Sequence, residues 1–143
     1  MSKPEKIPDQ YLTYFENMRP GENQLVWVAT IAPDKKPHLV PARFVTPLDQ
    51  NRIAIGCVFL KQTVANIRRN NQVTLAAVRF NEGYDGYMIK GTGEVLNEGD
   101  TFQKFKQRVY AATNGKRAIF SLLIVTIQHV YSLKPFDGRK KIL

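Results

Sequence analysis

The 143-residue sequence predicts a mainly β fold, in which six antiparallel strands form a closed or nearly closed barrel with a few short helices. Two observations lead to this prediction. Runs rich in Val, Ile, Thr and aromatic residues recur between clusters of turn residues. Most of these runs are joined by connections too short for a crossover, which favours antiparallel pairing. The length predicts one domain, residues 1–143.

The predicted order is helix, three strands, helix, two strands, helix, strand. Leu12 and Phe15 recur at helical spacing before Pro20-Gly21, which predicts an opening helix over residues 9–18. Strands are predicted over residues 25–32, 38–46, 52–59, 73–80, 87–96 and 119–133, and further helices over 62–70 and 100–112. Pro41 lies inside the second strand, where its missing N–H marks an edge, a bulge or a site that faces a ligand.

Composition limits the classes of function. Twenty-one Lys and Arg against twelve Asp and Glu give a net charge of +9, which favours an anionic partner such as nucleic acid, a membrane surface or a phosphorylated small molecule. The single cysteine, Cys57, excludes an intrachain disulfide, and no Cys/His cluster indicates a metal site. The longest apolar stretch, 122–127, is too short to span a bilayer and no signal core opens the sequence, so we expect a cytoplasmic protein.

Lys61, Gln62 and Thr63 stand where the third predicted strand gives way to a helix. The first turn of a helix has unpaired N–H groups and a partial positive charge, so a phosphate placed there gains hydrogen bonds. The three side chains can add further donors. The alternative is that Thr63 only caps the helix and Lys61 is solvated. The local sequence leaves both interpretations open.

Small residues in adjacent strands form a second feature. Pro41 and Arg43 alternate onto one strand face, and Gly56 lies in the next strand, which suggests that a flat group approaches the backbone or that a bulge occurs. Gly91 and Gly93 indicate a barrel corner or a closely packed neighbour. No arrangement of His, Ser, Cys or carboxylates indicates hydrolysis, so the catalytic residues stay unknown and reactive chemistry would come from a bound cofactor.

The order of five segments resembles the pyridoxamine 5'-phosphate oxidase-like FMN-binding split barrels, and most closely their small FMN-binding proteins. The segments are residues 37–41 (PHLVP), 51–55 (NRIAI), 61–70 (KQTVANIRRN), 73–75 (VTL) and 91–94 (GTGE). The resemblance runs from about residue 10 to residue 134. It implies a split-barrel homodimer with FMN in grooves at the interface. It also implies an FMN-dependent oxidoreductase or electron-transfer protein with a small-molecule redox substrate or an electron partner.

The resemblance also implies where FMN would lie. Its phosphate would bind near Lys61, Gln62 and Thr63, with help from the second strand around Pro41 to Arg43. The isoalloxazine would lie along two strand backbones, and Tyr87 would contact the ring edge. The implied strand residues are Val40, Pro41, Ala42 and Arg43, together with Gly56, Cys57 and Val58.

The sequence departs from the family in two places. Many members carry an Arg-Lys or Lys-Thr pair where this chain has Gln62-Thr63, so one charge is missing beside the phosphate, and Lys61 or Arg43 is the candidate replacement. The chain is also shorter than true pyridoxamine phosphate oxidases and lacks their C-terminal substrate-binding segment. Oxidation of vitamin B6 is therefore not expected. Basic residues 134–143 would form a dimer-wrapping or solvated extension.

Two alternatives remain at this point. The same fold could hold the deazaflavin F420 or haem in place of FMN. A basic β-barrel could also bind nucleic acid by a strip of Tyr84, Tyr87, Arg79 and Lys90. The lysines and arginines are scattered along the chain and no nucleic-acid motif is present, which argues against this second alternative.

Overall fold

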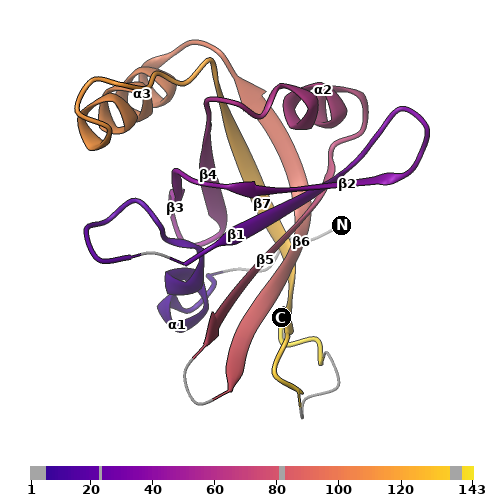
Figure 1. Ribbon diagram of the computed structural model, residues 1–143. Helices are drawn as coiled ribbons and strands as arrows, with labels where there is room; N and C mark the ends of the chain where they lie inside the picture. The colour runs from indigo at the N-terminus through magenta and orange to yellow at the C-terminus, as the bar shows by residue number, and fades with distance from the viewer. Residues whose placement is uncertain (1–5, 23, 81–82, 136–139) are drawn as a thin grey trace.

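The computed structural model describes residues 6–22, 24–80, 83–135 and 140–143 (Figure 1). Seven antiparallel strands form one curled sheet in the order β2-β1-β5-β6-β7-β4-β3. The strands are β1 (Val26–Ile31), β2 (Pro37–Ala42), β3 (Val45–Pro47), β4 (Arg52–Cys57), β5 (Gln72–Phe80), β6 (Tyr84–Leu96) and β7 (Ser121–Ser132). The helices are α1 (Asp9–Leu12), the 3-10 turn η1 (Thr13–Phe15), α2 (Lys61–Arg69) and α3 (Asp100–Ala112). The prediction of a mainly β, antiparallel, barrel-like fold is confirmed.

The predicted number of strands, six, is wrong, because the second predicted strand breaks into β2 and β3. Phe44 at the break has φ +36°, a left-handed conformation that a strand cannot contain. The buried side chain of Asn17 spans the break. Its Nδ2 donates to the carbonyl of Ala42 at 3.0 Å, and its Oδ1 accepts from the N–H of Val45 at 2.7 Å. One amide therefore replaces the hydrogen bonds that a continuous strand would make.

The opening helix is shorter than predicted. Helical structure ends at Phe15, and Glu16 has extended backbone angles. The buried carboxylate of Glu16 accepts hydrogen bonds from the N–H groups of Met18 at 2.8 Å and Arg19 at 3.1 Å, and from the hydroxyl of Thr46. These side-chain bonds satisfy N–H groups that a helix would otherwise pair with carbonyls, so the chain turns here.

Two hydrophobic cores lie on opposite faces of the sheet. The larger core fills the curled interior, and Val64 and Ile67 of α2 belong to it. The smaller core lies between α3 and the outer face of β4 and β7, where Phe105 packs with Leu122 and Ile124. Helices α2 and α3 thus sit at the same end of the molecule, while α1 lies toward the other end (Figure 1).

The close approach predicted at Gly91 and Gly93 is confirmed. The β6–β7 register shifts between Lys90 and Gly91, and a Cβ at Gly91 would stand 2.1 Å from the carbonyl oxygen of Thr126. A Cβ at Gly93 would stand 3.0 Å from Cδ1 of Ile67. The missing side chain at Gly93 therefore makes the space in which α2 packs on the sheet.

The end of the chain folds back along β7. The Ser132 N–H donates to the Lys140 carbonyl at 2.8 Å, and the Ile142 N–H donates to the Val130 carbonyl at 2.7 Å. Of the predicted basic extension, residues 136–139 lie outside the described residues, and residues 140–143 pack on their own protomer. None of the helices in the described ranges is long and apolar enough to cross a membrane.

Candidate functional site

The first turn of α2 holds the strongest indication of a ligand. Its N-cap residue is Leu60, with no side-chain capping bond, so the alternative that Thr63 caps the helix is wrong. Thr63 is only 1% exposed, and its Oγ1 has no hydrogen-bond partner among the described residues. A buried hydroxyl without a partner costs about 1–3 kcal/mol. The hydroxyl of Thr63 lies in the first turn, whose N–H groups have no carbonyl partner within the helix. This turn is therefore a candidate anion site.

A polar network holds α2 against β1. Asn66 donates through Nδ2 to Oγ1 of Thr30 at 3.0 Å, and its Oδ1 accepts from Nε2 of Gln62 at 2.7 Å. Arg69 also donates to the carbonyl of Ile31. Gln62 and Lys61 are both exposed, and the amide of Gln62 is bonded within the helix. Asn66 and Thr30 were not predicted as site residues, because a polar side chain on the inner face of a helix or strand carries no signal until its partner is known.

Pro41 and Arg43 are exposed and Ala42 is buried, as strand alternation predicts, while Val40 is half-buried. β2 lies at the edge of the sheet, where proline is tolerated. Pro41, Ala42 and Arg43 line a groove of about 340 Å³ together with the loop that contains Gln24. The edge strand therefore offers an open surface at these predicted residues.

Gly56, Cys57 and Val58 lie deeper. The N–H of Gly56 donates to the carbonyl of Phe44 at 3.0 Å, where the β3–β4 pairing begins. The space beside Gly56 is filled by the chain itself, because a Cβ there would stand 3.0 Å from both Phe105 and Ile119. Cys57 is completely buried, and this burial raises the pKa of its thiol to about 12. Val58 is half-buried.

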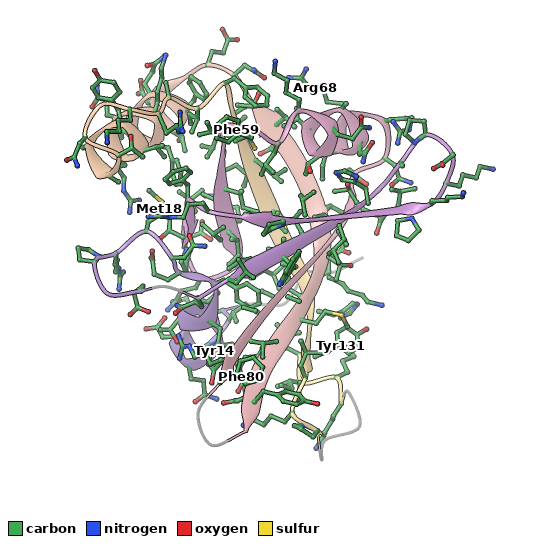
Figure 2. The ribbon with its side chains drawn as sticks, in the orientation of Figure 1. Tyr14, Met18, Phe59, Arg68, Phe80 and Tyr131 are labelled. Carbon is green, nitrogen blue, oxygen red and sulfur yellow. The ribbon has the colours of Figure 1, made fainter. Side chains whose placement is uncertain are left out.

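Tyr87 lies apart from the other predicted residues. Its ring packs edge-on against Tyr11 at 4.9 Å and Tyr14 at 4.8 Å between ring centres. The residues of this end are separated from those of α2, as Figure 2 shows by the positions of Tyr14 and Arg68. Within one protomer, the structure does not bring Tyr87 to the first turn of α2.

A short hydrogen bond joins the same aromatic cluster to an acid. The hydroxyl of Tyr14 donates to Oδ2 of Asp85 at 2.5 Å. Burial, followed by this hydrogen bond and the charge of Asp85, raises the pKa of Tyr14 to about 12. The guanidinium of Arg79 lies 3.8 Å from the centre of the Tyr14 ring.

These contacts also bear on the nucleic-acid alternative. Tyr87 is only 7% exposed, and Arg79 stacks on Tyr14, whereas Tyr84 and Lys90 are exposed. A strip that stacks bases needs exposed ring faces beside its cations. The four predicted residues do not form one.

Comparisons with known proteins agree with this geometry. Residues 10–134 match the family model of pyridoxamine 5'-phosphate oxidase. The chain belongs to the pyridoxamine 5'-phosphate oxidase family. It is 27% identical over 130 residues to the uncharacterized protein MJ0282 of Methanocaldococcus jannaschii, covering 90% of this chain and 85% of that protein.

Solved structures show the same fold for this family member. The crystal structure of HupZ from Group A Streptococcus is similar with a TM-score of 0.78 and 22% identity, covering 96% of this chain and 99% of that one. An FMN-binding protein from Syntrophomonas wolfei is similar with a TM-score of 0.74 and 13% identity, covering 88% of each chain. At these identities the likeness concerns the split-barrel fold.

Proposed function

We propose that this family member is an FMN-binding redox protein that holds the phosphate of FMN at the first turn of α2. The observation that carries the proposal is the hydroxyl of Thr63, which is buried without a partner among the described residues. A phosphate oxygen accepts from a hydroxyl and from the N–H groups of the same turn. Lys61, exposed at the start of α2, supplies a positive charge. These groups fit a dianionic phosphate, and Thr63 gains the partner that it lacks.

The groove at Pro41, Ala42 and Arg43 is the proposed place for the flavin ring. Phe44, which follows Arg43, accepts a hydrogen bond from the N–H of Gly56 near the end of β4, and the chain continues from β4 into α2. Bound FMN would supply hydride or electron exchange. The chain would contribute binding, orientation and the exclusion of water. The protein is proposed to act as an oxidoreductase or as an electron carrier.

The outer face of the sheet supports a homodimer. Trp27 is 36% exposed although it lies between the buried residues Val26 and Val28, so its ring points out of the barrel. Its partners across the ladders are Pro41 and Ala76. Other apolar residues are exposed on β1, β2, β5 and β6 or beside them, namely Leu25, Leu39, Phe80 and Tyr84. A second copy that covers this face would also cover the proposed flavin groove beside Pro41.

Binding of FMN to the purified protein tests the cofactor. The double variant Lys61→Ala/Thr63→Ala should weaken the binding of FMN by about 2–4 kcal/mol, because it removes two hydrogen bonds to the charged phosphate. The matched control is Thr101→Ala/Lys104→Ala, which removes the same residue types from exposed positions of α3. Quenching of FMN fluorescence measures both affinities. An affinity equal to that of the control would rule out the first turn of α2 as the phosphate site.

The absorbance spectrum of the protein as purified separates FMN from the other cofactors. FMN gives bands in the blue and near-ultraviolet, a deazaflavin gives a single violet band, and haem gives a Soret peak. Either of the last two would replace FMN in the proposal.

The oligomeric state tests the interface. Light scattering after gel filtration should give a dimer for the protein and for Lys61→Ala/Thr63→Ala, since those residues lie away from the outer face. Trp27→Glu should give a monomer, because it would bury a charge in an apolar interface. A dimeric Trp27→Glu variant would place the interface elsewhere.

A further inference from the structure

A second cavity of about 390 Å³ opens near α1, beside the chain that returns along β7. Among the described residues that line it, every charged side chain is a lysine, namely Lys134, Lys140 and Lys141. Tyr11 and Tyr87 form its aromatic wall. Three exposed lysines thus line one concave opening, and none of the described lining residues carries a negative charge.

The backbone around the lysines is held by hydrogen bonds. The carbonyl of Lys140 accepts from Ser132, and Lys141 forms a bridge with Tyr131 of β7. The N–H of Lys134 donates to Oγ of Ser132 at 3.1 Å. The backbone that carries the three lysines is therefore paired with β7 beside the opening, while their side chains are exposed.

The aromatic wall lies beside these charges. Tyr87 is nearly buried, and its ring packs edge-on against Tyr11. The Nζ of Lys134 lies 6.0 Å from the centre of the Tyr87 ring and 3.9 Å from Oδ1 of Asp85. The two other lysines line the cavity without such an ion pair among the described contacts. The three lysines are exposed, so they attract an anion through a field that salt screens.

We propose that this cavity binds a small polyanion through phosphate or carboxylate oxygens, at a site separate from the first turn of α2. Its volume lies within the range of about 300–1,000 Å³ common for small-molecule sites. Ammonium groups on flexible stems suit a compact polyanion of either chemistry. The proposal rests on the C-terminal residues and the tyrosines, so it holds whether or not α2 binds FMN.

Titration calorimetry at low ionic strength, with FMN present, tests the site with two probes, pyrophosphate and citrate. The variant Lys134→Ala/Lys141→Ala should lose at least tenfold in affinity. The control Lys104→Ala/Lys116→Ala removes the same net charge from exposed positions elsewhere, and should change the affinity less than twofold. Tighter binding of pyrophosphate or of citrate identifies a phosphate or a carboxylate ligand. An equal loss of affinity in both variants would mean that the probe is attracted only by the net charge of the protein, and would overturn the proposal.

Nuclear magnetic resonance of the unmodified protein provides an independent test. It uses no variant, so misfolding of a variant cannot affect the result. Resonances of labelled Tyr11 and Tyr87 should shift on addition of pyrophosphate or citrate, while exposed Tyr110 on α3 should not. Shifts confined to α2, or none at millimolar probe, would also overturn the proposal. Because the tyrosines report position, this outcome is distinct from a failure of FMN to bind.

Discussion

The substitution Thr63→Val should change stability and FMN affinity in opposite directions. It replaces a buried, unpartnered hydroxyl by a methyl group of nearly the same volume. Removing that hydroxyl should stabilise the cofactor-free protein by about 1 kcal/mol or more. For a chain of this length, the melting temperature should rise by about 3 °C. The same change removes a hydrogen bond to phosphate worth about 1.5–3 kcal/mol, which weakens FMN roughly tenfold or more.

The two effects meet when FMN is added. At a concentration of FMN about 100 times the dissociation constant of the unmodified protein, binding stabilises that protein by about 2.7 kcal/mol. A tenfold weaker variant gains only about 1.4 kcal/mol under the same conditions. The stability advantage of Thr63→Val should therefore disappear in the presence of FMN. Urea unfolding with and without FMN, and fluorescence titration, measure these quantities.

Thr30→Val is the matched control. Thr30 is as buried as Thr63, but its Oγ1 accepts from Nδ2 of Asn66 at 3.0 Å. Its replacement leaves that amide without this partner, so it should destabilise the cofactor-free protein by about 1–3 kcal/mol. If Thr63→Val is also destabilising, its hydroxyl has a partner and the reasoning fails. If it is stabilising but FMN affinity is unchanged, the hydroxyl does not face the phosphate.

Three further predictions concern the structure around the site. Gly93→Ala should destabilise the protein by about 1–3 kcal/mol in urea unfolding, because the added methyl meets Ile67 at 3.0 Å. Asn17→Ala should lower the free energy of unfolding by about 2–4 kcal/mol in the same assay, since it removes the hydrogen bonds of the amide to the N–H of Val45 and the carbonyl of Ala42. Cys57 should react with a thiol reagent only after unfolding. Because burial raises its folded pKa from 9.0 to about 12, the unfolded chain loses this proton first, and stability should fall between pH 9 and 12.

Each of these has a clear opposite result. If Gly93→Ala and the unmodified protein unfold at the same urea concentration, α2 can shift away from the added methyl group without loss of stability. A loss for Asn17→Ala no greater than for an exposed Gln103→Ala change would remove the bridging role of the amide. Rapid labelling of Cys57 in the folded protein would contradict its burial, and Cys57→Ala should remove its part of the alkaline loss of stability.

Local sequence determined most of the secondary structure. The helix predicted over 100–112 matches α3 residue for residue, because Phe102, Phe105 and Val109 keep helical spacing on one apolar face. The boundaries of α2 differ by a single residue at each end. At Gly91 and Gly93 a barrel corner or a closely packed neighbour was predicted, and the structure shows close neighbours at both.

The sequence was insufficient where a distant side chain sets the backbone. The division between β2 and β3 depends on Asn17, which lies 28 residues before Val45 along the chain. The end of the opening helical segment depends on Glu16, whose carboxylate also reaches Thr46. Neither polar residue differs locally from one on a solvated surface. Their roles follow from burial, and burial is a property of the packed chain.

The same division applies to the candidate site. Residue types and spacing alone determined that a cation and a hydroxyl stand at the start of a helix after a strand, and that the chain has an excess of positive charge. Only the tertiary structure decided that Thr63 is buried without a hydrogen-bond partner among the described residues. It also decided that Phe105 occupies the space beside Gly56, and that the ring of Tyr87 packs on Tyr11 of α1. The physical reason is that hydrogen-bond satisfaction and free volume depend on contacts between residues far apart in the chain.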